Sequence, residues 1–433
     1  MREPSAGCPV LHGSKSRIRP SGLRVRNLTP VTGTEIDLAD PDFYVEGVPH
    51  HMFRRLREEA PVFWHEEAEG PGFWAITRYD DVMQLSRDHR TYSSAKGAVF
   101  LFDPPPEDLV EMQLMMLNMD PPKHTKLRSL VNRGFTPHRI SEIELHVRDI
   151  CARIIDKVAR RGECDFVSEV AAELPLQVIA EMMGVPLEER QMVFDWSNRL
   201  IGFDDPEFQT SQDDGKAAAT EMFAYANQLA SERVRCPKDD LVSILMHSEV
   251  EGEKLTELEF DLFFILLAVA GNETTRNLIS GGMCALSENP AERARLRQNP
   301  DLLPSAVEEM LRWVSPVMHF RRTATHDIDL HGQKIREGDK VVLWYISANR
   351  DAAVFPDPDR FDVGRTPNDH LAFGLGTHFC LGNNLARLEI RVMFEEILRR
   401  LPDLELAGPV RRLRSAFING IKEMPVHFTP EAG

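Results

Sequence analysis

The chain has 433 residues, of which 42% are hydrophobic and 27% are charged, a composition typical of a globular protein with ample material for a core. Asp and Glu number 68 against 51 Lys and Arg, and the net charge of −17 argues against nucleic-acid binding, which depends on basic residues. Six cysteines without a C-x-x-C pair predict neither a disulfide scaffold nor a zinc ribbon. The longest apolar run, Leu262–Ala270, is too short to span a membrane. We therefore expect a cytoplasmic protein.

The N-terminus is basic although the chain as a whole is acidic. Residues 1–26 contain six Lys and Arg against Glu3 alone, and they lack the apolar stretch of a secretory signal. Because chain ends are commonly disordered, we expect residues 1–30 to form a disordered basic arm. No repeat or Gly/Ser linker divides the rest of the sequence, so residues 31–433 are expected to form a single large domain.

Short strand patterns and longer helical patterns follow along the chain. Aromatic and β-branched residues predict strands at 73–79 and 340–347, and a hairpin at 327–338 with its turn at His331-Gly332. Apolar residues at helical spacing predict helices at 147–160 and 174–185, the second of which ends at Gly184. The proline-rich stretches 104–106 and 356–361 are expected to be ordered loops.

The longest predicted helix runs from Thr256 to Ser287. Thr256 is a suitable N-cap residue, and Glu259 three residues later completes a capping box. No proline interrupts the chain between Pro237 and Pro290. A helix of about 32 residues greatly exceeds the mean of about 11–12, and with an apolar middle it must run through the interior of a large domain. The fold is therefore predicted to be mainly α with a minor β region.

A glycine-rich loop around Cys380 carries the strongest functional signal. Glycines at 374, 376 and 382 surround this cysteine, and an amphipathic helix follows directly. A dinucleotide-binding loop is excluded because position 379, where G-x-G-x-x-G requires glycine, is Phe379. A cysteine just before a helix N-terminus is well placed to form a thiolate. One sulfur without a second Cys or His at ligand spacing fits a haem iron with a proximal cysteine, rather than zinc or an iron–sulfur cluster.

The pattern Phe373-Gly374-x-Gly376-x-His378-x-Cys380-x-Gly382 resembles, position for position, the haem-binding loop of the cytochrome P450 monooxygenases. The resemblance covers nearly the whole chain from about Asp37. It implies the cytochrome P450 fold, with haem b held between the long central helix and the helix after the Cys loop. It also implies that Cys380 is the iron ligand and that Phe373, His378 and Gly382 contact the haem.

The segment AGNETT at 270–275 lies in the middle of the predicted central helix. An acid and two alcohols are costly inside a buried helix, because a buried carboxylate needs a partner or a raised pKa. The family resemblance supplies a chemical reason, since activation of O2 requires protons. It implies that Thr274 donates a proton, that Glu273 relays protons from solvent, and that Gly271 makes room for O2.

Glu309 and Arg312 form an E-x-x-R pair on a predicted helix. By spacing alone such an i,i+3 pair is usually a solvated surface pair of little energetic value. The resemblance implies instead that the two charges hold the segment 355–365, which precedes the Cys loop, and so support haem binding.

Haem carries two propionates, which require cationic partners. The resemblance implies that His124, Arg128, Arg322 and His378 bind them, and arginine is suited to bidentate contacts with carboxylates. His124 and Arg128 are four residues apart and share one helical face. Arg321 leaves an ambiguity of one residue, and the spacing to the hairpin favours Arg322.

The expected substrate pocket is almost entirely apolar. By resemblance it is lined by the segments 96–117, 263–269, 317–320 and 417–418, although we expect only about half of these residues to touch substrate because apolar residues at helical spacing usually form the core. The stretches 268–277, 314–324 and 413–426 are similar to bacterial hydroxylases of sterol side chains and methyl-branched lipids. This similarity implies insertion of one oxygen atom of O2 into a terminal C–H bond of such a substrate. A terpenoid hydroxylase of the same fold is the alternative, whereas a peroxide-driven enzyme or a non-enzymatic haem protein would not need Glu273 and Thr274.

Electrons are expected from a separate protein, because no flavin or reductase domain follows the Cys380 helix in this sequence. Resemblance to soluble bacterial members implies an iron–sulfur ferredoxin with its own reductase, and a monomeric enzyme. Arg128, Arg133, Arg387 and Arg391 are predicted to form a basic docking face for an acidic ferredoxin.

Overall fold

The computed structural model describes residues 37–431 except 69, 250–251 and 253, so the basic arm predicted at 1–30 lies outside the described residues. The described residues belong to one compact unit that spans residues 34–433. Its α-helices are α1 (His50–Glu59), α2 (Tyr79–Arg87), α3 (Pro106–Met112), α4 (Lys123–Asn132), α5 (Pro137–Glu142), α6 (Glu144–Ala159), α7 (Glu173–Met183), α8 (Arg190–Ile201), α9 (Gln212–Arg235), α10 (Leu241–His247), α11 (Glu257–Glu288), α12 (Pro290–Gln298), α13 (Leu303–Val314), α14 (Tyr345–Ala348) and α15 (Asn383–Arg400).

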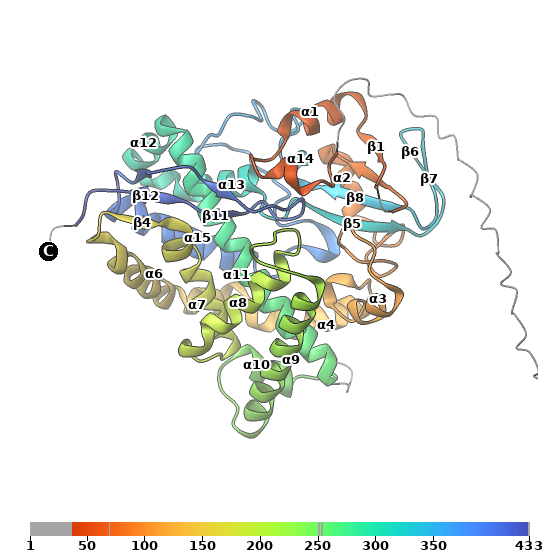
Figure 1. Cartoon of the computed structure of the whole chain (residues 1–433), viewed down its shortest axis with the longest axis horizontal. Coiled ribbons are helices and arrows are strands. Elements are labelled where there is room, and N and C mark those ends of the chain that lie inside the picture. Colours follow the sequence, from red (N-terminus) through yellow and green to blue (C-terminus); the bar gives the residue numbers. More distant parts are fainter. Residues whose placement is uncertain (1–36, 69, 250–251, 253, 432–433) are drawn as a thin grey trace, which may run out of the picture. The chain divides into compact units, whose positions relative to one another are not determined.

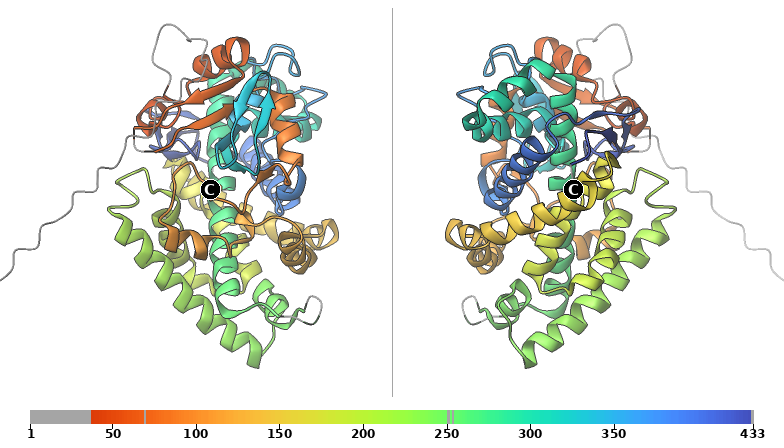
Figure 2. Two further views of the ribbon diagram at one scale, coloured as in Figure 1. Left: turned by 90° about the vertical axis from the view of Figure 1, so that its right-hand side faces the viewer. Right: turned by 90° about the vertical axis from the view of Figure 1, so that its left-hand side faces the viewer.

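The strands are short and form a minor part of the fold, as predicted. They are β1 (Val62–His65), β2 (Phe73–Ile76), β3 (Tyr92–Ser93), β4 (Glu163–Asp165), β5 (His319–Ala324), β6 (Ile328–Leu330), β7 (Gln333–Ile335), β8 (Lys340–Trp344), β9 (Glu405–Leu406), β10 (Arg411–Arg412), β11 (Ile421–Glu423) and β12 (Pro425–His427). The largest sheet has the order β1-β2-β8-β5-β3, in which only β2 and β8 run parallel. Strands β4, β12 and β9 form a second sheet, and β6–β7 and β10–β11 are hairpins. In Figures 1 and 2 the five-stranded sheet lies at the opposite side of the described unit from α9 and α10.

Helix α11 is the centre of the fold. It begins with the predicted capping box, in which the Glu259 N–H donates to Thr256 Oγ1 at 3.2 Å and the Thr256 N–H donates to the Glu259 carboxylate at 3.1 Å. Helices α7, α8, α9, α13 and α15 pack around it (Figure 1), and most of its residues are buried in the main hydrophobic core. Among the described helices, none is both long and apolar enough to cross a membrane.

The other predicted elements occur with shifted ends. The predicted helix at 174–185 is α7, which ends at Gly184 with φ of 80°, and the predicted hairpin turns through His331 and Gly332 at φ of 52° and 81°. Three predicted ends are wrong, because β2 stops at Ile76, β8 gives way to α14 after Trp344, and α3 begins inside the proline stretch 104–106. The start of α2 depends on a long-range contact, since the Tyr79 N–H donates to the Asp351 carboxylate at 2.9 Å.

A buried glutamate lies where α15 packs against α6. Glu389 is 2% exposed, lies close to Cys151, and has one carboxyl oxygen without a hydrogen-bond partner. Burial raises the pKa of Glu389 well above its ordinary value. The folded protein therefore keeps a proton that the unfolded chain releases above its pKa of about 4.3, so this group makes folding less favourable as the pH rises.

We expect Glu389→Gln to raise the thermal unfolding midpoint more at about pH 8 than at about pH 5. The pH dependence is large, because each pH unit between the unfolded and folded pKa changes the free energy of unfolding by up to about 1.4 kcal/mol. As a control, Glu395→Gln on the same helix removes a half-buried carboxylate paired with Arg148 and Arg391, and its effect should be similar at both pH values. An equal effect of Glu389→Gln at the two pH values would contradict a protonated Glu389.

Candidate functional site

The loop around Cys380 has a backbone that only its glycines allow. Gly374 and Gly376 have φ of 65° and 70°, and a Cβ on Gly376 would lie 2.6 Å from the carbonyl oxygen of Ser86. The Cys380 N–H donates to the Phe373 carbonyl at 2.9 Å, which closes the loop, and α15 begins three residues after the cysteine. The loop therefore presents one thiol close to a helix N-terminus, as the sequence pattern predicts.

The thiol of Cys380 is half-buried and has a polar environment that favours its charged form. Burial raises the pKa of this thiol, whereas the Gly382 N–H and the guanidinium groups of Arg128 and Arg387 oppose that rise. No other cysteine in the described part of the chain faces such a set of donors and cations. A bound metal ion would shift the balance to the thiolate, because only the deprotonated sulfur is a ligand.

The backbone two residues after Cys380 leaves room for a further group. A Cβ added to Gly382 would meet no atom within 4 Å, so the backbone borders open space at this point. On α11, which otherwise is mostly buried, Ala270 is exposed and Thr274 is half-buried. Since α11 packs against α15, these accessible positions and the Cys380 loop lie on neighbouring elements.

Basic side chains that could receive propionates meet at the edge of the loop. The rings of His124 and His378 lie 4.4 Å apart, and both ring nitrogens of His124 are buried without a hydrogen-bond partner. Burial, together with the positive charge of Arg322, lowers the pKa of His124 to about 4 and that of His378 to about 2. A carboxylate would supply the partners that His124 lacks, so these residues fit an anionic group.

Arg322, and not Arg321, belongs to this group. Arg321 points away and is held by the Asp103 carboxylate at 2.6 Å and the Phe102 carbonyl at 3.2 Å. The two arginines are neighbours on β5, where successive side chains point to opposite faces. Arg128 is held against the Cys loop, because its guanidinium donates to the carbonyl oxygens of Thr377 and Phe379.

The acid–alcohol pair lies on α11 as predicted, but its acid already has a partner. Glu273 and Arg276 form an ion pair in which the two side chains are 1% and 6% exposed. Burial raises the pKa of Glu273, and Arg276 opposes the rise. The Thr274 hydroxyl donates to the Ala270 carbonyl at 2.7 Å, so its oxygen remains able to accept a proton or a hydrogen bond. Arg276 was not identified from the sequence, because i,i+3 pairs usually lie on the surface.

Gly271 lies where α7 packs against α11. A Cβ at this position would lie 2.9 Å from Cγ1 of Ile179 on α7. The missing side chain therefore allows α7 and α11 to pack closely, and the expectation that Gly271 also makes room for O2 stays a prediction.

The E-x-x-R pair is fully buried and joins α13 to the segment before the Cys loop. Two hydrogen bonds of 2.8 Å connect Arg312 to the Glu309 carboxylate, and Arg312 also donates to the Pro358 carbonyl at 2.9 Å. The same carboxylate accepts hydrogen bonds from Arg365 at 3.1 and 3.2 Å and from the Asp362 N–H at 2.9 Å. These contacts place the pair at the segment 355–365 and not at the surface.

An aromatic cluster brings together side chains from distant segments. It consists of Phe100, Phe102, Phe203, Phe320 and Phe417, and the ring centroids of its neighbouring pairs lie 5.2 to 6.5 Å apart. Phe203 comes from the loop between α8 and α9, which has no periodic pattern and was therefore missed from the sequence. By contrast, the segment 263–269 contributes mostly to the main core.

The predicted basic docking face is wrong for two of its members. Arg387 pairs with Glu308 at 2.7 Å, and Arg391 pairs with Glu144 at 3.0 Å, so neither contributes a free positive charge. The side chain of Arg133 lies outside the described part of the structure.

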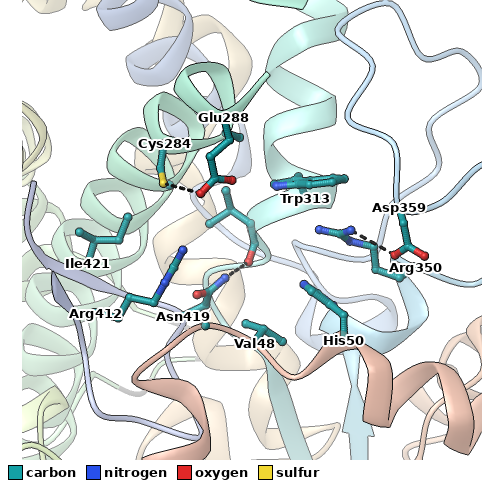
Figure 3. Close-up of a pocket in the computed structure, with 14 residues that line it drawn as sticks. Val48, His50, Cys284, Glu288, Trp313, Arg350, Asp359, Arg412, Asn419 and Ile421 are labelled. Carbon is teal, nitrogen blue, oxygen red and sulfur yellow. Dashed lines mark hydrogen bonds and ion pairs between the residues drawn. The ribbon is translucent and has the colours of Figure 1, made fainter. Parts of the chain in front are cut away.

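A separate pocket of about 380 Å³ lies between the C-terminal part of α11, α13 and the β10–β11 hairpin (Figure 3). Cys284 donates to Glu288 at 3.4 Å, and the Arg350 guanidinium stacks on the Trp313 ring at 3.5 Å. None of the predicted site residues lines this pocket.

Comparisons with known proteins agree with this geometry. The family model for cytochrome P450 matches residues 176–406. The chain is 42% identical to the steroid C26-monooxygenase of Rhodococcus jostii, with 92% of this chain and 85% of that protein covered. It is 45% identical to the methyl-branched lipid omega-hydroxylase of Mycobacterium bovis, with 94% and 99% covered. A solved structure of a Mycobacterium marinum cytochrome P450 in complex with pseudoionone matches with a TM-score of 0.85 and 38% identity, covering 93% of this chain and 100% of that one. The chain belongs to the cytochrome P450 family and is a monooxygenase that uses haem with a cysteine thiolate as iron ligand.

Proposed function

We propose that this enzyme hydroxylates the terminal methyl group of a steroid side chain or a methyl-branched lipid, with Cys380 as the iron ligand. The relatives named for these two activities each cover more than nine tenths of the chain, and this observation carries the substrate proposal. The aromatic cluster supports it, because its side chains offer an apolar surface that suits a long hydrocarbon or a ring system. A terminal C–H bond must be presented by shape, since it offers no polar handle.

The residues of the site have separate tasks in this proposal. Haem, when bound, activates O2 for insertion of one oxygen atom into the substrate C–H bond. Cys380 holds the iron, Phe373 and Gly382 shape its surroundings, and His124, Arg128, Arg322 and His378 hold the propionates. Glu309 and Arg312 keep the segment before the Cys loop in place.

Proton delivery is assigned to the pair on α11. The Thr274 hydroxyl donates a proton at the O2 site, and Glu273 relays a proton from solvent to that hydroxyl. The raised pKa of Glu273 suits a relay, because a group must hold a proton before it can transfer it.

A spectral titration tests the substrate class. We expect cholesterol or a methyl-branched fatty acid to shift the haem absorption of the purified enzyme at lower concentration than pseudoionone does, because the relatives named for steroid and branched-lipid substrates cover more than nine tenths of the chain. Terminal hydroxylation of the bound compound should follow when electrons are supplied. If only the terpenoid shifts the spectrum and is turned over, the steroid and lipid proposal is wrong.

That outcome would favour the second candidate, a terpenoid hydroxylase of the same fold. The solved relative in complex with pseudoionone supports this alternative.

As a cytochrome P450 the enzyme acts on a small-molecule substrate with O2 and receives electrons from a redox partner. We propose a ferredoxin and its reductase as that partner, a monomeric enzyme, and a cytoplasmic location. We also propose that residues 31–433 form one domain and residues 1–30 a basic arm.

Phe379 supports docking of the ferredoxin near the Cys loop, because it is a large apolar side chain that is 36% exposed one residue before Cys380.

A further inference from the structure

The ion pair of Glu273 is held from outside its own helix. Arg276 donates through Nη1 to Oδ1 of Asn198 on α8 at 2.9 Å, and its guanidinium lies 5.8 Å from the ring centroid of Phe194 on the same helix. Its other terminal nitrogen pairs with Glu273, and its Nε is buried without a hydrogen-bond partner. Helix α8 therefore determines where the guanidinium of Arg276 lies and which of its nitrogen atoms can donate to Glu273.

Asn198 also lies at the point where α8 passes into the loop that carries Phe203 of the aromatic cluster. Its backbone carbonyl accepts the Gly202 N–H at 2.9 Å, which ends the helix, and Phe203 follows directly. The Phe203 ring lies 5.6 Å from Phe102 in the aromatic cluster. A substrate that moves these rings would therefore also move the last turn of α8, which carries Asn198.

We propose that Arg276 and Asn198 are positioning residues that control when Glu273 can leave its ion pair, and that Asn198 links this control to the aromatic wall of the substrate pocket. Asn198 accepts a hydrogen bond from one terminal nitrogen of Arg276, so only the other nitrogen pairs with Glu273 and the ion pair is weaker. Without Asn198, both terminal nitrogens of Arg276 can turn to Glu273, and a bidentate arginine–carboxylate pair holds more tightly. This inference rests on the proposed role of Glu273 in proton delivery.

The test uses the haem-loaded enzyme with a surrogate ferredoxin and reductase, and with cholesterol or the branched acid, whichever gives the larger spectral shift. We expect Asn198→Ala to lower kcat three- to tenfold while KM and the spectral Kd stay within twofold. Asn198→Asp should keep kcat at or above the wild-type value, because a carboxylate at this position competes for Arg276. Gln191→Ala, which removes an amide that donates to Asp195 on the exposed side of α8, should leave kcat unchanged.

A double variant separates positioning from a general effect of α8. Asn198→Ala should have no further effect on kcat when it is combined with Arg276→Gln, because both substitutions act through the same guanidinium. If Arg276→Gln does not fold, the opposite effects of Ala and Asp at position 198 decide the question.

Two results would overturn the inference. One is a wild-type kcat for Asn198→Ala, and the other is an equal loss for Asn198→Ala and Asn198→Asp, which would indicate a merely structural role. If Thr274→Ala still uncouples the reaction in either case, only the control by Arg276 and Asn198 is wrong. If Thr274→Ala leaves coupling intact, the proposed proton relay fails and the inference falls with it.

Discussion

Cys380→Ser should abolish the carbon monoxide absorption band that is characteristic of thiolate ligation and reduce product formation to background. The hydroxyl of serine is a hard, weakly acidic group and cannot replace the electron donation of a thiolate. The loop itself should persist, because its shape depends on glycines and backbone hydrogen bonds and not on the sulfur. Absorption spectra of the reduced enzyme with carbon monoxide, together with product analysis, measure both effects.

Cys284→Ser serves as the matched control. Cys284 is buried on α11, and burial raises the pKa of its thiol to about 12, so it is a structural thiol. This variant should keep the carbon monoxide band and most of the activity. Retention of the band in Cys380→Ser, or its loss in Cys284→Ser, would show that the ligand has been assigned to the wrong cysteine.

Thr274→Ala should uncouple electron transfer from hydroxylation. We expect the product formed per electron pair to fall about tenfold or more, with the missing electrons recovered as hydrogen peroxide, because proton transfer from a positioned group contributes about 10²–10⁴-fold. Substrate binding should change little, since the hydroxyl donates only to the Ala270 carbonyl in this structure. The measurement compares product, peroxide and reducing equivalents consumed.

The neighbouring Thr275 provides a control of identical chemistry. It is 5% exposed, whereas Thr274 is half-buried at the accessible part of α11. Thr275→Ala should keep coupling within twofold of the wild type. Equal uncoupling in both variants would point to a disturbed helix, and full coupling in Thr274→Ala would remove this residue from proton delivery.

The parts of the site that could be predicted from the sequence are those with local causes. The Cys380 loop depends on glycines within ten residues of one another, and the start of α11 depends on Thr256 and Glu259, which interact across one turn. Backbone dihedral preferences and capping hydrogen bonds act over a few residues, so a pattern of residue types reports them directly. The same holds for the hairpin turn at His331 and Gly332.

Burial and choice of partner could not be predicted in this way. Glu309 and Arg312 have the spacing of a surface pair, and only the approach of the segment 355–365 buries them. Arg387 appears from the sequence to be a free cation, yet Glu308 from another helix neutralises it. The close packing of Ile179 from α7 on Gly271 could not be predicted either, because the two residues lie far apart in the sequence.

The sequence by itself determined which residues we propose for the chemistry of this protein, and the tertiary structure decided how they are held. The Cys380 loop, the Glu273–Thr274 pair and the long central helix follow from short-range interactions that leave a recognisable pattern. The aromatic cluster and the hydrogen bond from Arg276 to Asn198 join segments that are far apart in the chain. The ion pair of Glu273 with Arg276 depends on the burial of both side chains. These features arise only when distant elements pack together, because the energy of a charge or an apolar ring depends on what surrounds it and not on its neighbours in sequence.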